Sequence, residues 1–257
     1  MIGVSLAEMG SAEAKVVGQA VEYKAGDTVM RGYLAYDDAA KLPHPGILVV
    51  HEWWGVDDYV RGRARQLAEL GYTALALDMY GEGRTAQDPQ TAGKLSSEIS
   101  KDIPVAKQRF EAALIFLRKQ KHVAPHQIAA IGYCFGGAVV LNMARSGEDL
   151  AGVVSFHGNL TASTPAKPGE VHARILVCHG ADDPFVPASQ VEGFRKEMAD
   201  AGAKSEIVIY PGAKHSFTNP ASTERGQKFK LPIAYNQAAD KQSWADMRAF
   251  FKSLFGK

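Results

Sequence analysis

From residue 16 onward the chain alternates between short apolar runs and longer segments in which apolar residues recur every three or four positions. Two β-rich runs, residues 16–23 and 29–36, flank a turn that contains Gly26 and predict a β-hairpin. Six later runs are continuously apolar, which is typical of strands covered on both faces of a parallel sheet. These runs span residues 46–51, 73–78, 127–132, 152–157, 174–179 and 205–210.

Four segments between these runs carry an apolar stripe with the period of an α-helix. Asp57 is placed to cap the first helix, which Gly71 ends, and Pro104 opens the second. The other two stripes cover residues 191–201 and 244–254. Strands that alternate with helices in this way predict an α/β fold, with a mostly parallel sheet of about eight strands and helices on both faces.

We expect this fold to occupy residues 16–257 as one domain, preceded by a poorly patterned N-terminal extension at residues 1–15. The extension has neither the basic start nor the apolar core of a signal peptide. Residues 218–240 are polar and lack periodicity, so we expect a loop there that acts as a lid over a site.

Composition narrows the class of protein. Lys and Arg (29) balance Asp and Glu (28), so no excess charge favours nucleic acid or an anionic membrane as a partner. No apolar run approaches the roughly 18 residues that a membrane-spanning helix needs. Two cysteines are too few for a disulfide framework and favour a reducing compartment. We therefore expect a cytoplasmic enzyme, monomeric or homodimeric, unless a leader upstream of Met1 has been removed.

The decisive segment is residues 132–136, Gly-Tyr-Cys-Phe-Gly, between a predicted strand and a helix that begins near Gly136. It has the form of a nucleophile elbow, with Cys134 where serine usually stands. A sharp turn of this kind needs small residues two positions before and after the nucleophile, and the helix N-terminus favours a thiolate. The alternative is a buried structural cysteine in a glycine-rich turn.

Two partners follow in the order that an elbow predicts, acid and then histidine. Asp182 and Asp183 follow the strand at 174–179, and His215 follows the next strand. The carboxyl ends of parallel strands meet at one edge of a sheet, so these side chains are expected to lie together with Cys134. Asp183 is preferred to Asp182 because Pro184 keeps it extended, although the two positions can be reversed.

The loop after the first parallel strand supplies two further candidates. The backbone N–H groups of Trp53 and Phe135 are placed to form an oxyanion hole. Glu52 can take the thiol proton or hold the resting thiol inactive; otherwise it forms a salt bridge with Arg84 or Arg61. His51 and Glu52 also suggest a metal, but neither an HExxH nor a CxxC spacing is present, so no metal or cofactor is predicted.

The motifs HEWWG, LALDMYGEG, GYCFGG, HGADDPFVP and AKHSF, in that order, resemble the dienelactone hydrolase family, cysteine hydrolases of the α/β-hydrolase fold. The resemblance covers roughly residues 21–255. It implies that Cys134, Asp183 and His215 form the triad, that Glu52 activates the thiol, and that Trp53 and Phe135 form the oxyanion hole. A neutral thiol bonded to Glu52 at rest is the arrangement we expect; a permanent Cys134–His215 ion pair is the alternative.

Family members that open dienelactones clamp the substrate carboxylate with two arginines. Arg84 is a counterpart of the first, but no arginine follows His215 until Arg225, so dienelactone itself is not assigned. Aromatic residues are also expected at the pocket mouth and would suit small aromatic or cyclic esters. The expected substrate-binding aromatic residues are Trp54, Tyr133 and Phe217.

These observations predict a hydrolase of small carboxylic esters or lactones that works through a thioacyl-enzyme. Promiscuous cleavage of aryl esters or phosphotriesters by the same cysteine is an alternative. Two other classes stay open: a non-catalytic binding protein of hydrolase fold, and a redox protein that uses Cys134. The second lacks a CxxC motif, and Cys178 lies in a predicted buried strand, a poor position for a resolving thiol.

Overall fold

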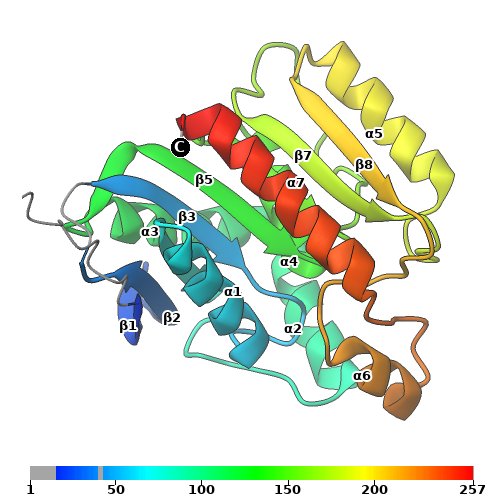
Figure 1. The fold of residues 1–257 in the computed structure, drawn as a ribbon, viewed down its shortest axis with the longest axis horizontal. Helices are drawn as coiled ribbons and strands as arrows, with labels where there is room; N and C mark the ends of the chain where they lie inside the picture. The colour runs from blue at the N-terminus through cyan, green and yellow to red at the C-terminus, as the bar shows by residue number, and fades with distance from the viewer. Residues whose placement is uncertain (1–15, 40–42, 257) are drawn as a thin grey trace, which may run out of the picture.

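The computed structural model describes residues 16–39 and 43–256, so the predicted extension at residues 1–15 lies outside the described residues. Within them, one eight-stranded sheet has the order β1-β2-β4-β3-β5-β6-β7-β8 (Figure 1). The β1–β2 and β2–β4 pairs are antiparallel and all the others are parallel. The strands are β1 (Val16–Ala25), β2 (Thr28–Asp37), β3 (His44–Val50), β4 (Thr73–Leu77), β5 (Val123–Tyr133), β6 (Gly152–Phe156), β7 (Arg174–Gly180) and β8 (Ser205–Tyr210).

Helices cover both faces of this sheet. In Figure 1 the helices α1 (Asp58–Glu69) and α7 (Gln237–Phe255) cross the face toward the viewer. The other face is covered by α2 (Pro89–Lys101), α3 (Ile103–Arg118), α4 (Phe135–Arg145) and α5 (Ala188–Asp200), whose buried side chains share one apolar cluster. The predicted α/β-hydrolase architecture is therefore confirmed.

The core explains why the parallel strands read as continuous apolar runs. Along β3, Ile47 and Val49 belong to the cluster under α1 and α7, whereas Leu48 and Val50 belong to the cluster on the opposite face. All four side chains are fully buried. Both faces of the strand are thus withdrawn from water, and no polar position interrupts the run.

Two helices were absent from the sequence prediction. α2 begins at an Asp88 cap whose side chain accepts the Thr91 N–H, and it carries a short apolar stripe. α6 (Ser222–Phe229) lies inside the segment 218–240 that we predicted as a loop, and α7 already begins at Gln237. That prediction was wrong because α6 buries only Ser222 and Gly226, so no apolar periodicity marks it.

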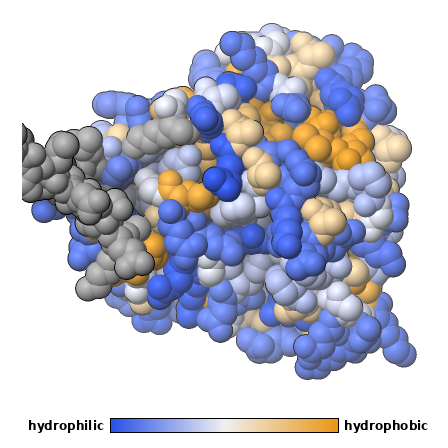
Figure 2. Space-filling model, in the orientation of Figure 1, coloured by the Kyte–Doolittle hydropathy of each residue, from blue (hydrophilic) through white to orange (hydrophobic). Residues whose placement is uncertain are grey.

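The surface is mostly hydrophilic on the face shown in Figure 2, with a larger hydrophobic patch at the upper right, where Figure 1 places β7 and β8. The edge strand β8 carries one of the few large hydrophobic residues that are exposed, Ile209. No helix within the described residues is both long enough and apolar enough to cross a membrane.

The turn from β5 into α4 has no room for side chains at its glycines. A Cβ atom on Gly132 would overlap the carbonyl group of Gly136, and one on Gly136 would overlap the carbonyl of Val50. These clashes involve backbone atoms, which cannot move aside as a flexible side chain can. The strand, the turn and the helix therefore pack at backbone contact distance.

We predict that Gly132→Ala lowers the free energy of unfolding by more than about 2 kcal/mol, because the clash strains a packed turn. Gly193→Ala is the matched control, since Gly193 is exposed within α5 and a Cβ there meets nothing within 4 Å. The control should stabilise the protein by about 0.5–1 kcal/mol, the usual gain for alanine over glycine in a helix. Urea denaturation of both variants measures the difference; equal stabilities would contradict the tight turn.

Candidate active site

Cys134 stands at the turn between β5 and α4 with φ 53° and ψ −113°. This left-handed backbone is uncommon for a residue with a side chain and marks local strain. The turn is fixed by backbone hydrogen bonds: the Cys134 N–H donates to the carbonyl of Phe156 at 3.0 Å, and the Gly136 N–H donates to the carbonyl of His51 at 3.1 Å. The elbow geometry predicted from the glycines is thus present.

Three of the predicted side chains meet at the carboxyl edge of the sheet. His215 Nε2 lies 3.1 Å from Cys134 Sγ, and His215 Nδ1 lies 2.8 Å from Asp183 Oδ2. Asp183 is buried, whereas Asp182 is exposed. The structure therefore places Asp183, rather than its neighbour, on the imidazole.

The electrostatic surroundings make His215 unusually basic. Burial alone disfavours the imidazolium, but the negative charge of the Cys134 thiolate and the hydrogen bonds to Asp183 and Cys134 together outweigh it. The pKa of His215 rises to about 10 as a result. A charged thiolate at Cys134 therefore favours a proton on the neighbouring His215.

The predicted oxyanion donors border the same site. Trp53 and Phe135 both line the cavity into which Cys134 opens. Within the described part of the chain, neither backbone N–H donates to another protein group. Phe135 is also the first residue of α4, where helix N–H groups have no partner inside the helix.

Glu52 does not contact the thiol. Its carboxylate is buried and accepts hydrogen bonds from Ser216 Oγ at 2.9 Å and from Asn219 Nδ2 at 2.6 Å. Burial and the nearby charge of Asp57 raise the pKa of Glu52, against the opposing effects of these hydrogen bonds and of Arg225. The resting arrangement that we expected, a thiol bonded to Glu52, is therefore replaced by the Cys134–His215 pair. The alternative salt bridges are absent too, since Arg84 pairs with Glu98 and Arg61 with Asp58.

The cavity beside Cys134 has a volume of about 510 Å³. Apart from the thiol of Cys134 and the imidazole of His215, none of the described residues that line it is ionisable. One part of the wall is apolar and comes from α2, α3 and α4; another part is polar but uncharged. The apolar part includes Ile99, Ile103, Ala106, Val139 and Met143, and the polar part includes Asn142, Asn159, Thr161 and Ser163.

The sequence model of the dienelactone hydrolase family matches residues 30–255. The chain belongs to the dienelactone hydrolase family. Protein usf of Aquifex pyrophilus is 28% identical over 241 residues, which cover 92% of this chain and 98% of that protein. A protein of Aquifex aeolicus with the provisional name carboxymethylenebutenolidase is 27% identical over 242 residues, covering 92% of this chain and 99% of its own length. The chain is accordingly a hydrolase.

Solved structures agree with this family. A dienelactone hydrolase-like promiscuous phosphotriesterase from metagenomic libraries is similar with a TM-score of 0.88 and 34% identity, over 93% of this chain and 98% of that one. An esterase from Thermogutta terrifontis has a TM-score of 0.66 and 17% identity, over 96% of this chain and 94% of that one. The second similarity concerns the fold alone.

In this member of the dienelactone hydrolase family, Arg84 does not line the cavity where substrate contact was predicted for it. The Arg84 guanidinium donates to the Tyr80 carbonyl and lies 3.4 Å from Glu98 Oε2, outside the cavity wall. Its charge is directed along the surface beside α2 instead of toward the thiol. The prediction failed because sequence position does not determine which way a long side chain turns.

The predicted aromatic contacts need the same correction. Trp54, Tyr133 and Phe217 are all buried, and none lines the cavity. They pack behind the site: Tyr133 stacks on Phe156, and Trp54 lies under the Arg225 guanidinium. Their bulk supports the site from inside the core. The aromatic side chains that line the cavity are instead those of Trp53, Phe135 and Phe185.

Sequence reasoning missed several residues of the site. Phe185 is half exposed at the cavity and packs edge-on against His215, with ring centroids 5.0 Å apart. Leu231 and Ile233 follow α6 and line the cavity. The segment 218–240, in which a lid was predicted, therefore borders the site. Ser216 directly follows His215, and this adjacency was the only signal in the sequence that marked Ser216.

We predict that iodoacetamide labels Cys134 in the free enzyme rapidly at pH 7, because an imidazolium beside the sulfur favours the reactive thiolate. His215→Ala should slow labelling at least about tenfold. Glu52→Gln should change it less than about threefold, since Glu52 binds Ser216 and Asn219 and not the thiol. Mass spectrometry separates the Cys134 adduct from any at buried Cys178. Slow labelling that Glu52→Gln accelerates would instead support a thiol held by Glu52.

Proposed function

We propose that this protein hydrolyses neutral carboxylic esters or lactones through a thioacyl-enzyme, with Cys134 as the nucleophile. The observation that supports this most is the Cys134–His215–Asp183 arrangement at a cavity whose other described lining residues are uncharged. A nucleophile, a base in contact with it and a carboxylate that orients the base are the three parts of hydrolase triads.

In the proposed acylation step, the Cys134 thiolate attacks the substrate carbonyl carbon. The carbonyl oxygen takes the negative charge and accepts hydrogen bonds from the Trp53 and Phe135 amides. When the tetrahedral intermediate collapses, the bond to the leaving oxygen breaks, and that oxygen takes the proton from His215 Nε2. The products of this step are an alcohol, a thioester and a neutral imidazole.

Deacylation uses the same histidine, His215, as a base instead of an acid. Once Sγ is acylated it carries no charge, so the attraction that helps to raise the pKa of His215 disappears. A less basic, neutral His215 can then take a proton from water as the water attacks the thioester. Asp183 accepts the Nδ1–H and thereby keeps Nε2 free for this role. Expulsion of the thiolate releases the carboxylic acid and restores the starting charges.

In this proposal Glu52 serves mainly to fix the loop that follows His215. It binds Ser216 and Asn219, which lie one and four residues beyond the histidine, and its own neighbour Trp53 supplies an oxyanion donor. A direct part in removing the thiol proton would require the carboxylate to leave both hydrogen bonds.

The charge of the cavity wall limits the substrate. A carboxylate in this space would lose its hydration, which is costly, and the one lining residue that can be cationic, His215, already pairs with the Cys134 thiolate. Arg84 cannot supply a second cation from its position against Glu98. We therefore assign uncharged acyl groups to the cavity, in contrast to substrates such as dienelactones that carry a carboxylate.

Phosphotriester cleavage is a second candidate activity. It is favoured by the 34% identity to a dienelactone hydrolase-like promiscuous phosphotriesterase and by the cavity's lack of charge, since a phosphotriester is neutral. The same thiolate would bond to phosphorus while the oxyanion hole receives the phosphoryl oxygen; the bond to the aryl oxygen would break, and that oxygen would take the proton from His215. Water, activated by the neutral His215, would then cleave the sulfur–phosphorus bond and release a phosphodiester.

The first test compares two esters with acyl chains of five carbons, 4-nitrophenyl valerate and 4-nitrophenyl hydrogen glutarate. We predict that kcat/KM is at least about 30-fold lower for the glutarate, because its terminal carboxylate must be buried without a partner. Diethyl 4-nitrophenyl phosphate, assayed in parallel, measures the second activity.

Cysteine variants connect this result to the site. Cys134→Ala should lose both activities, whereas Cys178→Ser should keep most of them, since burial raises the pKa of Cys178 to about 12 and removes it from thiolate chemistry. Preference for the glutarate would overturn the assignment of neutral substrates. Turnover of no ester combined with consumption of peroxide would favour the redox class, and neither activity would favour a binding protein.

A second pair of variants tests the acid. Asp183→Asn should lower kcat by about 10³- to 10⁴-fold, because the amide favours the wrong tautomer of His215. Asp182→Asn is the matched control and should stay within about twofold, since the Asp182 side chain is exposed. Stopped-flow measurement of the 4-nitrophenol burst shows whether acylation or deacylation is slowed. A crippled Asp182 variant beside an active Asp183 variant would reverse the two roles.

A further inference from the structure

His157 directly follows β6 and is fully buried behind the nucleophile. Its backbone has φ 41°, a left-handed conformation that a side-chain-bearing residue adopts at a cost. The imidazole packs edge-on against His215, with ring centroids 5.3 Å apart. It is therefore a second histidine in contact with the site, and the proposed reaction gives it no proton to transfer.

The hydrogen bonds of His157 define its tautomer. The Cys134 N–H is shared between the Phe156 carbonyl at 3.0 Å and Nδ1 of His157 at 3.1 Å, and an N–H donor at Nδ1 requires an unprotonated acceptor. Nε2 consequently carries the hydrogen and donates to Thr218 Oγ1 at 2.7 Å. Burial, and then the charges of His215 and Arg63, hold the pKa of His157 well below its usual range, so the ring stays neutral.

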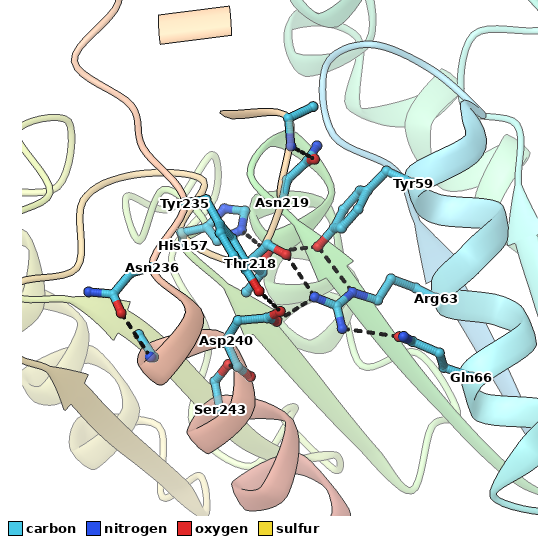
Figure 3. A network of polar contacts seen from close by, with 12 residues as sticks. Tyr59, Arg63, Gln66, His157, Thr218, Asn219, Tyr235, Asn236, Asp240 and Ser243 are labelled. Carbon is cyan, nitrogen blue, oxygen red and sulfur yellow. Dashed lines mark hydrogen bonds and ion pairs between the residues drawn. The ribbon is translucent and has the colours of Figure 1, made fainter. Parts of the chain in front are cut away.

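Thr218 is itself fixed by two residues of α1 (Figure 3). Its hydroxyl lies 2.7 Å from the Tyr59 hydroxyl, and its carbonyl accepts from Arg63 Nη2 at 2.7 Å. Arg63 belongs to α1 and forms a buried ion pair with Asp240 of α7. The His157 ring is thus connected to two helices, while its other nitrogen faces the elbow.

We propose that His157 is a positioning residue, which accepts the amide hydrogen of Cys134 and is held in that orientation by Thr218. The inference rests on the proposed function of Cys134 as the nucleophile. Cys134 has a strained backbone, and its sulfur must stay within reach of both His215 and the substrate carbonyl. A displacement of about 1 Å at a reacting group can cost about 100-fold in rate, so an acceptor that fixes the amide matters for turnover.

Two substitutions separate the two ring nitrogens. In His157→Asn the amide oxygen occupies roughly the place of Nδ1 and can still accept from Cys134. In His157→Gln the longer side chain can still donate to Thr218, but it offers no side-chain acceptor near the Cys134 amide, which then keeps only the Phe156 carbonyl. Thr218→Val keeps the side-chain volume and removes only the hydroxyl that holds the ring.

We predict that His157→Gln lowers kcat for 4-nitrophenyl valerate at least about tenfold with KM changed less than about twofold. The reason is that the substitution displaces the Cys134 sulfur and leaves the walls that bind the substrate unchanged. His157→Asn should keep at least about a third of kcat, and Thr218→Val should fall between them. The rate constant for iodoacetamide labelling of Cys134 should follow the same order. Melting temperatures show which variants are folded at the assay temperature.

The outcomes are distinct. Folded His157→Gln and Thr218→Val proteins with kcat and labelling within twofold of the wild type would overturn the proposal. Equal losses in His157→Asn and His157→Gln would also do so, since only one of them loses the acceptor. If neither His157 variant folds, Thr218→Val decides the matter by the same two measurements. A wild type that cleaves no ester would refute the proposed function, and the labelling rates would still test the positioning.

Discussion

The structure depends on the close approach of two strands and a helix at Cys134. Gly136 lies so near the carbonyl of Val50 that no side chain fits between α4 and β3. This contact forces the left-handed backbone of Cys134, a strain of about 1–3 kcal/mol that hydrogen bonds to Phe156 and His51 must offset. It also fixes where β3 ends relative to the sulfur, so the loop that carries Trp53 opens beside the thiol. The close approach of Gly136 to Val50 therefore positions both the proposed nucleophile and the loop that carries a proposed oxyanion donor.

A second constraint is that, apart from the Cys134–His215 pair, charged side chains lie around the cavity and not in its described wall. Arg63 pairs with Asp240 behind the site, and Glu52 is bound by Ser216 and Asn219. Water is a poor competitor in such a space, so the interaction of an imidazolium with a thiolate, or of an amide with an oxyanion, is stronger there than in solvent. The same property makes the space unfavourable for an anionic substrate. In the proposed function, catalytic strength and a preference for neutral substrates both follow from the scarcity of charge in this wall.

The sequence predicted what depends on pattern and order. A β-hairpin pattern and six apolar runs located the eight strands of the described sheet, and the succession of strand ends placed Cys134, Asp183 and His215 at one edge. It did not predict side-chain direction: Arg84 turns to Glu98, and Tyr133 points into the core, because packing against distant elements decides both. α6 was missed since it buries almost nothing apolar, and His157 because its partners come from the turn after β5 and from the loop after β8. Contacts between elements far apart in sequence leave no periodic signal.

The choice of sulfur over oxygen at the elbow changes what the histidine must do. A serine hydroxyl gives up its proton only as it attacks, so its histidine begins the cycle neutral. In the proposed mechanism the thiolate helps to raise the pKa of His215 to about 10, and the histidine begins the cycle as an acid. Formation of the thioester removes that charge, and the same nitrogen becomes a base when water must be activated. One covalent bond to Sγ thus sets the protonation of His215 in each half of the reaction, and Asp183 needs only to hold the ring in place through both.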